Sequence, residues 1–255
     1  MDLPGLALTA LLFVAGAQTP LLALLALRRR RTLLVVLGPY AVLVPLALAV
    51  GPAVDEPTRV GLLALAVAPA ELAAPGLASA VRARLDTTGA YVAGTIVVSL
   101  ALTLAFLGSV GPAALAAARD AAFAFLVGMT FGGVVPMWRD RVLPVLRRLG
   151  DLALIVLVGT AILRAAPALS LSALAIALVV LVVGAGAALG AARLGGGDPW
   201  SAVAGSGTRD FAVAAAIAGA ALPAAAALPL AYAAVLVLVG AVVVIVRRRN
   251  LGERR

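Results

Sequence analysis

Long apolar runs, separated by short gaps that carry arginine, constrain this chain more than any other feature. A helix needs about 20 predominantly apolar residues to cross the hydrocarbon core of a bilayer. The sequence is 64% hydrophobic and 12% charged, whereas a soluble domain is about half apolar and a quarter charged. We therefore expect an all-α integral membrane protein with nine spans, at residues 3–27, 32–53, 60–81, 87–110, 112–136, 150–166, 168–192, 199–221 and 224–246.

The arginines predict the orientation of these spans. All 20 basic residues are arginine, and they gather in alternate gaps such as 28–31 and 139–148. Basic loops remain in the cytoplasm, so we expect a multi-pass cell-membrane protein with its N-terminus outside and its C-terminus inside. The same pattern accounts for the net charge of +9 without a nucleic-acid partner. A signal peptide ending near Ala15-Gly16-Ala17 is the alternative for the first span, but Asp2 stands where a positive charge is usual.

The gap at 138–149 alternates basic and apolar residues after Trp138. Tryptophan and arginine suit the headgroup level of a bilayer. The stretch therefore predicts an interfacial anchor or a link between two halves of the protein.

The absence of cysteine and histidine excludes several kinds of chemistry. Disulfides and thiolate metal sites need cysteine, and histidine is the commonest metal ligand and proton shuttle. No nucleophile–base pair or metal cluster is visible, so we expect neither an enzyme, a cofactor nor a metal site.

Two spans carry charges beside residues that break helices. Glu71 lies between Pro69 and Pro75 in the third span. The eighth span contains Gly205, Gly207, Thr208, Arg209 and Asp210. A charge at bilayer depth usually has a partner or a task, and irregular backbone there must be surrounded by protein or line a cavity. Paired interruptions point to a transporter's binding site, although proline and glycine can also kink packed helices.

Most of the chain resembles the bile acid:sodium symporter family, short of that family's first helix. The segments that carry the resemblance are 12–48, 62–104, 126–163 and 175–244. The most specific is 202–214, where Gly-Thr-Arg-Asp precedes an alanine-rich half-helix much as Gly-Thr-Gln-Asn does in the family's ninth helix.

The resemblance implies a fold of two inverted repeats, here 1–110 and 111–255, that form a core and a panel. Two discontinuous helices would cross in the core near the middle of the bilayer. It also implies a secondary transporter that moves a small organic anion or similar metabolite by alternating access. The alternatives are a scaffold or sensor that no longer transports, or a related efflux carrier of the arsenite type, which could not use thiol-based metalloid handling because the chain has no cysteine.

The sodium ligands implied by the resemblance are mostly replaced. Its acidic residue and two amides fall on Gly205, Arg209 and Asp210, and a third-helix amide falls on Tyr40. A Ser-Asn pair falls on Ala74-Pro75. Thr95 keeps a hydroxyl, with Tyr91 one turn earlier, and Gln18 and Thr19 are possible substrate contacts in the panel. Too few oxygens remain for sodium.

A fixed cation could take the place of sodium. Arg209 stays protonated in any protein environment, and Glu71 could pair with it across the crossing. Asp210 is a second candidate, about 100° around the helix. A surplus carboxylate could bind a proton, so we expect proton coupling or none. These charges could instead form a static structural pair.

Overall fold

The computed structural model describes residues 3–18, 25–72, 74–106, 112–134, 136–165 and 170–252. Over these ranges the chain is helical and contains no strand. The helices are α1 (Leu3–Gln18), η1 (Ala26–Arg28), α3 (Arg30–Val50), η2 (Gly51–Ala53), α4 (Glu56–Val67), α5 (Ala74–Ala80), α6 (Leu85–Phe106), α7 (Pro112–Val134), α8 (Pro136–Ala165), α9 (Leu171–Gly195), α10 (Pro199–Ala202), η5 (Val203–Gly207), α11 (Phe211–Ala221), η6 (Pro223–Ala226) and α12 (Ala227–Gly252).

Helix ends follow local chemistry. The Ser170 hydroxyl accepts a hydrogen bond from the N–H of Ala173 (3.2 Å) and so caps the start of α9. The same helix ends at Gly196, whose φ of 68° is the left-handed conformation that glycine adopts at little cost. These two residues fix where α9 begins and ends.

Within the described ranges, four helical segments are long and apolar enough to cross a membrane. They are Arg30–Ala53, Leu85–Phe106, Leu171–Gly195 and Pro223–Arg247. Large apolar side chains on their outer faces are exposed, including Val182 and Val237, as expected where lipid covers the surface. The described part of the chain therefore fits a membrane protein.

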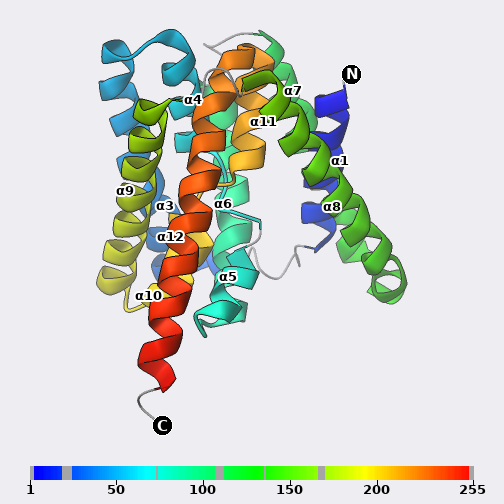
Figure 1. The fold of residues 1–255 in the computed structure, drawn as a ribbon. Coiled ribbons are helices and arrows are strands. Elements are labelled where there is room, and N and C mark those ends of the chain that lie inside the picture. The colour runs from blue at the N-terminus through cyan, green and yellow to red at the C-terminus, as the bar shows by residue number, and fades with distance from the viewer. Residues whose placement is uncertain are drawn as a thin grey trace.

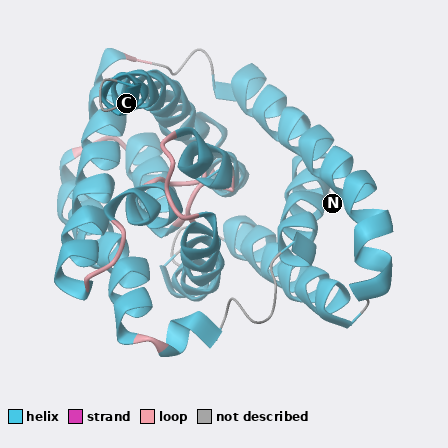
Figure 2. Cartoon of the chain, turned by 90° about the horizontal axis from the view of Figure 1, so that it is seen from below, coloured by secondary structure: helices cyan, strands magenta, loops and turns pink. Residues whose placement is uncertain are grey.

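The helices form two groups. Helix α1 packs against both α7 and α8, and these three are called the three-helix group here. The other helices form the main bundle, which α7 and α8 also contact through α6, α11 and α12. The views in Figures 1 and 2 show the three-helix group on one side of the main bundle. Helix α1 begins at one end of the molecule and α12 ends at the other (Figure 1).

Glycines bring α1 and α7 unusually close. A Cβ on Gly16 would collide with the carbonyl oxygen of Phe125, and one on Gly128 would collide with that of Phe13. Backbone cannot move aside as a side chain can, so only glycine allows this approach. The two helices therefore pack backbone to backbone.

The amphipathic stretch at 138–149 is not a separate segment. Helix α8 runs unbroken from Pro136 to Ala165 with Pro144 inside it, so the predicted gap forms the first turns of the helix that was expected at 150–166. Alternation of basic and apolar residues is equally compatible with a helix that emerges from the bilayer, which explains the difference. The predicted first span, 3–27, is a helix over Leu3–Gln18 followed by η1, with 19–24 outside the described residues.

The first interrupted helix consists of α4 and α5. Helix α4 ends at Val67, non-helical backbone follows at 68–72, and α5 begins at Ala74. Pro69 lies in this break. Pro75, which we expected in the break, instead occupies the first turn of α5, where a helix makes no use of the missing N–H.

The second interrupted helix consists of α10, η5 and α11. A π-helical turn, η5, contains Gly205 and Gly207, so these helix-breaking glycines lie in the turn and the non-helical residues are 208–210. A Cβ on Gly207 would lie 3.0 Å from the Cα of Ala185 in α9, so this glycine serves close packing within the turn. Helices α4 and α11 lie toward one end of the bundle, and α5 and α10 lie toward the other (Figure 1).

Candidate functional site

The two breaks touch each other through main-chain and side-chain hydrogen bonds. The N–H of Asp210 donates to the carbonyl oxygen of Pro69 (2.9 Å). In return, the N–H of Leu72 donates to the Asp210 carboxylate (3.3 Å). Segments about 140 residues apart in sequence thus satisfy backbone groups that the broken helices leave open.

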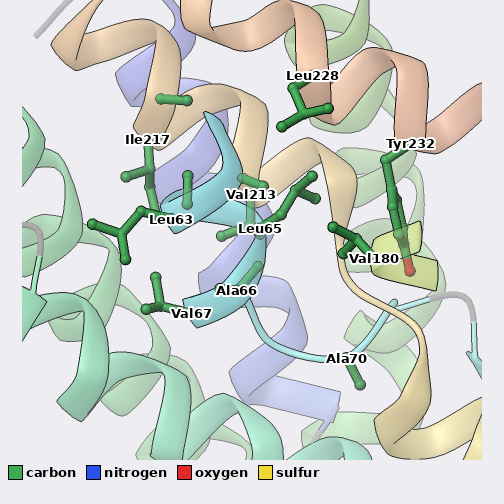
Figure 3. Packing of buried hydrophobic residues seen from close by; sticks show 14 of the residues in the cluster. Leu63, Leu65, Ala66, Val67, Ala70, Val180, Val213, Ile217, Leu228 and Tyr232 are labelled. Atoms are coloured by element: carbon green, nitrogen blue, oxygen red, sulfur yellow. The ribbon is translucent and has the colours of Figure 1, made fainter. Parts of the chain in front are cut away.

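Apolar side chains surround the junction. Figure 3 shows Leu63 and Leu65 from α4 packed beside Val213 and Ile217 from α11, with Tyr232 of α12 nearby. These residues are buried in one cluster. The charges at the junction are therefore shielded from water by the main bundle.

Arg209 is the largest fully buried side chain, with no exposed surface. Its Nη1 donates to the carbonyl oxygen of Ala68 (3.1 Å), and its Cζ lies 4.2 Å from the centre of the Tyr40 ring. Its main-chain N–H donates to the Tyr232 hydroxyl (2.9 Å). Within the described residues its Nε and Nη2 have no hydrogen-bond partner, so the guanidinium can still donate to an added oxygen.

The Arg209 guanidinium balances the partial negative charge at the C-terminal end of α4. The last carbonyls of a helix have no intrahelical partner and carry partial negative charge. Ala68 is the residue that follows α4, and its carbonyl oxygen faces the guanidinium and the Tyr40 hydroxyl (3.1 Å). Arg209 thus occupies the kind of helix end that suits a cation.

The Asp210 carboxylate balances the partial positive charge at the N-terminal end of α11. Its carboxylate accepts from the N–H of Val213 (2.8 Å) and is the N-cap of that helix. The other carboxylate oxygen accepts from Leu72, as described above. The hydrogen bonds of Asp210 therefore go to backbone N–H groups, and it fills the helix end that would suit an anion.

Two more predicted residues join the site. The Thr95 hydroxyl accepts from the N–H of Ala70 in the first break (3.0 Å). The Tyr40 hydroxyl lies 2.9 Å from the carbonyl oxygen of Thr95, and it can donate there or to Ala68. Both side chains are buried, so α3 and α6 hold the first break from either side.

The structure leaves other candidates at the edge of the site or outside it. Glu71 is half-buried in the first break, and its predicted ion pair with Arg209 stays a prediction. The Thr208 hydroxyl donates to the carbonyl of Ala204 (3.0 Å) within its own segment. Tyr91 lies beside Gly197 and Gly205, away from the crossing. Gln18 is exposed at the end of α1, and Thr19 lies outside the described residues.

Tyr232 is the functional candidate that sequence reasoning missed. It is fully buried, lies in the second turn of α12 and accepts a hydrogen bond from the Arg209 N–H. A single tyrosine in an apolar span also suits the membrane interface, so its position alone gave little signal. The stronger signal is that all three tyrosines of the chain lie within predicted spans.

A small pocket adjoins the first break where α1 meets the main bundle. Its volume is about 10 Å³, close to the minimum that holds one water molecule. It is lined by Leu12, Pro69, Ile96, Ser99, Leu100, Thr103, Val213 and Ile217. The pocket thus lies between the three-helix group and the junction of the breaks.

The described residues contain no group of three or more acidic, histidine or cysteine side chains that could hold a metal ion. Arg209 and Asp210 at the junction of the breaks, each hydrogen-bonded to backbone, stabilise the non-helical chain there. No protein-family model matches the sequence, and no curated protein is significantly similar to it.

Proposed function

We propose that this chain is a secondary transporter of the bile acid:sodium symporter type, which moves a small organic solute by alternating access. The observation that carries the proposal is the contact between two interrupted helices, made by Arg209 on Ala68 and by Asp210 on Pro69 and Leu72. Interrupted helices that meet in this way are typical of secondary transporters and demand a surrounding that supplies hydrogen bonds.

In this proposal nine spans form two inverted repeats, with the N-terminus outside and the C-terminus in the cytoplasm. The interrupted helices belong to the core, and the three-helix group acts as the panel. The close, glycine-mediated packing of α1 on α7 supports a unit that moves as a whole.

Arg209 takes the role of the coupling cation in the proposed mechanism. A permanently charged guanidinium is bonded to the carbonyl at the end of α4, where a bound cation would otherwise be favourable. We therefore expect sodium-independent transport. A proton on a carboxylate such as Glu71 is the remaining route to coupling.

The proposal is tested with purified protein in proteoliposomes. A thermal-stabilisation screen first selects solutes, and uptake of the labelled solute is then compared in sodium and potassium buffers. We expect equal uptake in both. Arg209→Gln should lower uptake by about 10- to 100-fold, because it removes a buried charge-assisted hydrogen bond.

Arg209→Lys is the matched variant, since it keeps the charge but loses the planar guanidinium over Tyr40. We expect its uptake to lie between those of the native protein and Arg209→Gln. Sodium-dependent uptake, or full activity of Arg209→Gln, would contradict the role of Arg209. Absence of uptake for every stabilising solute would favour a membrane scaffold.

A further inference from the structure

The pocket beside the first break contains a line of hydroxyls on one face of α6. Thr95, Ser99 and Thr103 follow at intervals of four residues, so they lie above one another on the helix. All three are buried, at 0%, 3% and 2% exposure. Thr95 bonds the break itself, whereas Ser99 and Thr103 line the pocket.

The residues that line this pocket carry no charge. Six of the eight are Leu, Ile, Val or Pro, and the other two are Ser99 and Thr103. A pocket of this kind binds apolar surface and at most one or two hydrogen-bonding groups. An ion entering it would lose its hydration without gaining a counter-charge from the lining.

The charges at the neighbouring junction of the two breaks are also balanced without an ionic solute. The positive end of α11 is filled by the Asp210 carboxylate, and the negative end of α4 by the Arg209 guanidinium. Arg209 is outnumbered by the acids Asp210 and Glu71 of the two breaks, so no further anion is needed to neutralise it. Its unpartnered Nε and Nη2 can be satisfied by an uncharged oxygen.

We propose that the pocket between α1, α6 and α11 is the solute site, and that its solute is an uncharged, mainly apolar molecule whose oxygen bonds Ser99 or Thr103. This inference rests on the proposed function and replaces the organic anion that the sequence favours. The closed pocket holds no more than about one water molecule. In this proposal the solute therefore enters only when α1 separates from α6 and α11.

The absence of cysteine from the chain allows a direct test. Ser99→Cys places one thiol in the pocket with little change in size. In nanodiscs, its labelling by neutral methyl methanethiosulfonate is timed in the presence of cyclohexanol, cyclohexanecarboxylate or cyclohexylammonium. These probes share a ring and differ in charge.

Val97→Cys is the matched control, because Val97 is 37% exposed on the outer side of the same helix. At tenfold excess over its dissociation constant, cyclohexanol should slow labelling of Ser99→Cys by about 10-fold and leave Val97→Cys unchanged. Replacing the second hydroxyl as well, by Thr103→Val, should weaken this protection by about 5- to 10-fold.

Equal protection by the carboxylate or the ammonium would overturn the assignment of charge, and absence of protection by cyclohexanol would overturn the site. Labelling does not require transport. Protection without uptake would therefore support the solute site and contradict the transport function. Uptake without protection would support the transport function and contradict the solute site.

Discussion

The two breaks touch, but they contribute different groups to their junction. The first break, at 68–72, contributes main-chain carbonyls and N–H groups, which are bonded by side chains from α3, α6 and the second break. The second break, at 208–210, contributes the charged side chains of Arg209 and Asp210. The charged side chains of the second break therefore bond main-chain groups of both breaks, whereas the first break contributes main-chain groups alone to these bonds.

Asp210→Ala should have the largest effect, because one carboxylate serves both breaks. We expect the free energy of unfolding to fall by about 2–4 kcal/mol, from the lost N-cap and the lost bond to Leu72. Thermal unfolding in detergent measures the loss. Hydrogen exchange should become faster in peptides that cover 68–72 and in those that cover 211–214.

Asp210→Asn is the control, since an amide oxygen can still cap α11. It should lose less stability than Asp210→Ala. Faster exchange at 211–214 alone in the alanine variant would show that the first break stands without the second.

A substitution in α9, where this helix packs against the turn before the second break, should lower stability by a smaller amount. A Cβ on Gly184 would lie 2.7 Å from the carbonyl oxygen of Gly207. Gly184→Ala should therefore lower stability by about 1–3 kcal/mol through overpacking against backbone. Thermal unfolding compares it with Gly186→Ala, on the same helix but with no atom within 4 Å of the added Cβ. Equal stability of the two variants would refute close packing at Gly184.

Thr95→Val should have the smallest effect, confined to the first break. It removes the acceptor of the Ala70 N–H and should lower stability by about 1 kcal/mol. Exchange should become faster at 68–72 and stay unchanged at 211–214. Thr160→Val is the control, because the Thr160 hydroxyl bonds only carbonyls of its own helix. Faster exchange in both breaks would show that their dependence is mutual.

The helical class and the membrane character could be predicted from apolar runs alone. The described residues confirm the helical class, and their four long apolar helices fit a membrane protein. Proline and glycine identify the neighbourhood of each break but not its limits. Pro75 fits the first turn of a helix, and Gly205 and Gly207 fit a π-helical turn packed on α6 and α9. Such choices depend on neighbours distant in sequence, which spacing does not reveal.

The charged residues of the site could be predicted from the sequence, but their hydrogen-bond partners could not. Buried charge at Arg209 and Asp210 follows from their place in an apolar span. Their main-chain partners follow from where α4 ends, which depends on three-dimensional packing. Tyr40 was predicted because it stands where the family that the chain resembles has an amide. Tyr232 matches no expected ligand position, so it was not predicted.

Arg209 has a thermodynamic consequence for any transport cycle. A dissociable ion enters from one compartment and leaves into another, and the difference in its chemical potential drives the accompanying solute. A guanidinium tethered at Arg209 returns unchanged after every turnover and draws no energy from a gradient. In the proposed cycle this position therefore supports only equilibration or exchange of the cargo, and uphill accumulation would require a separate source of work.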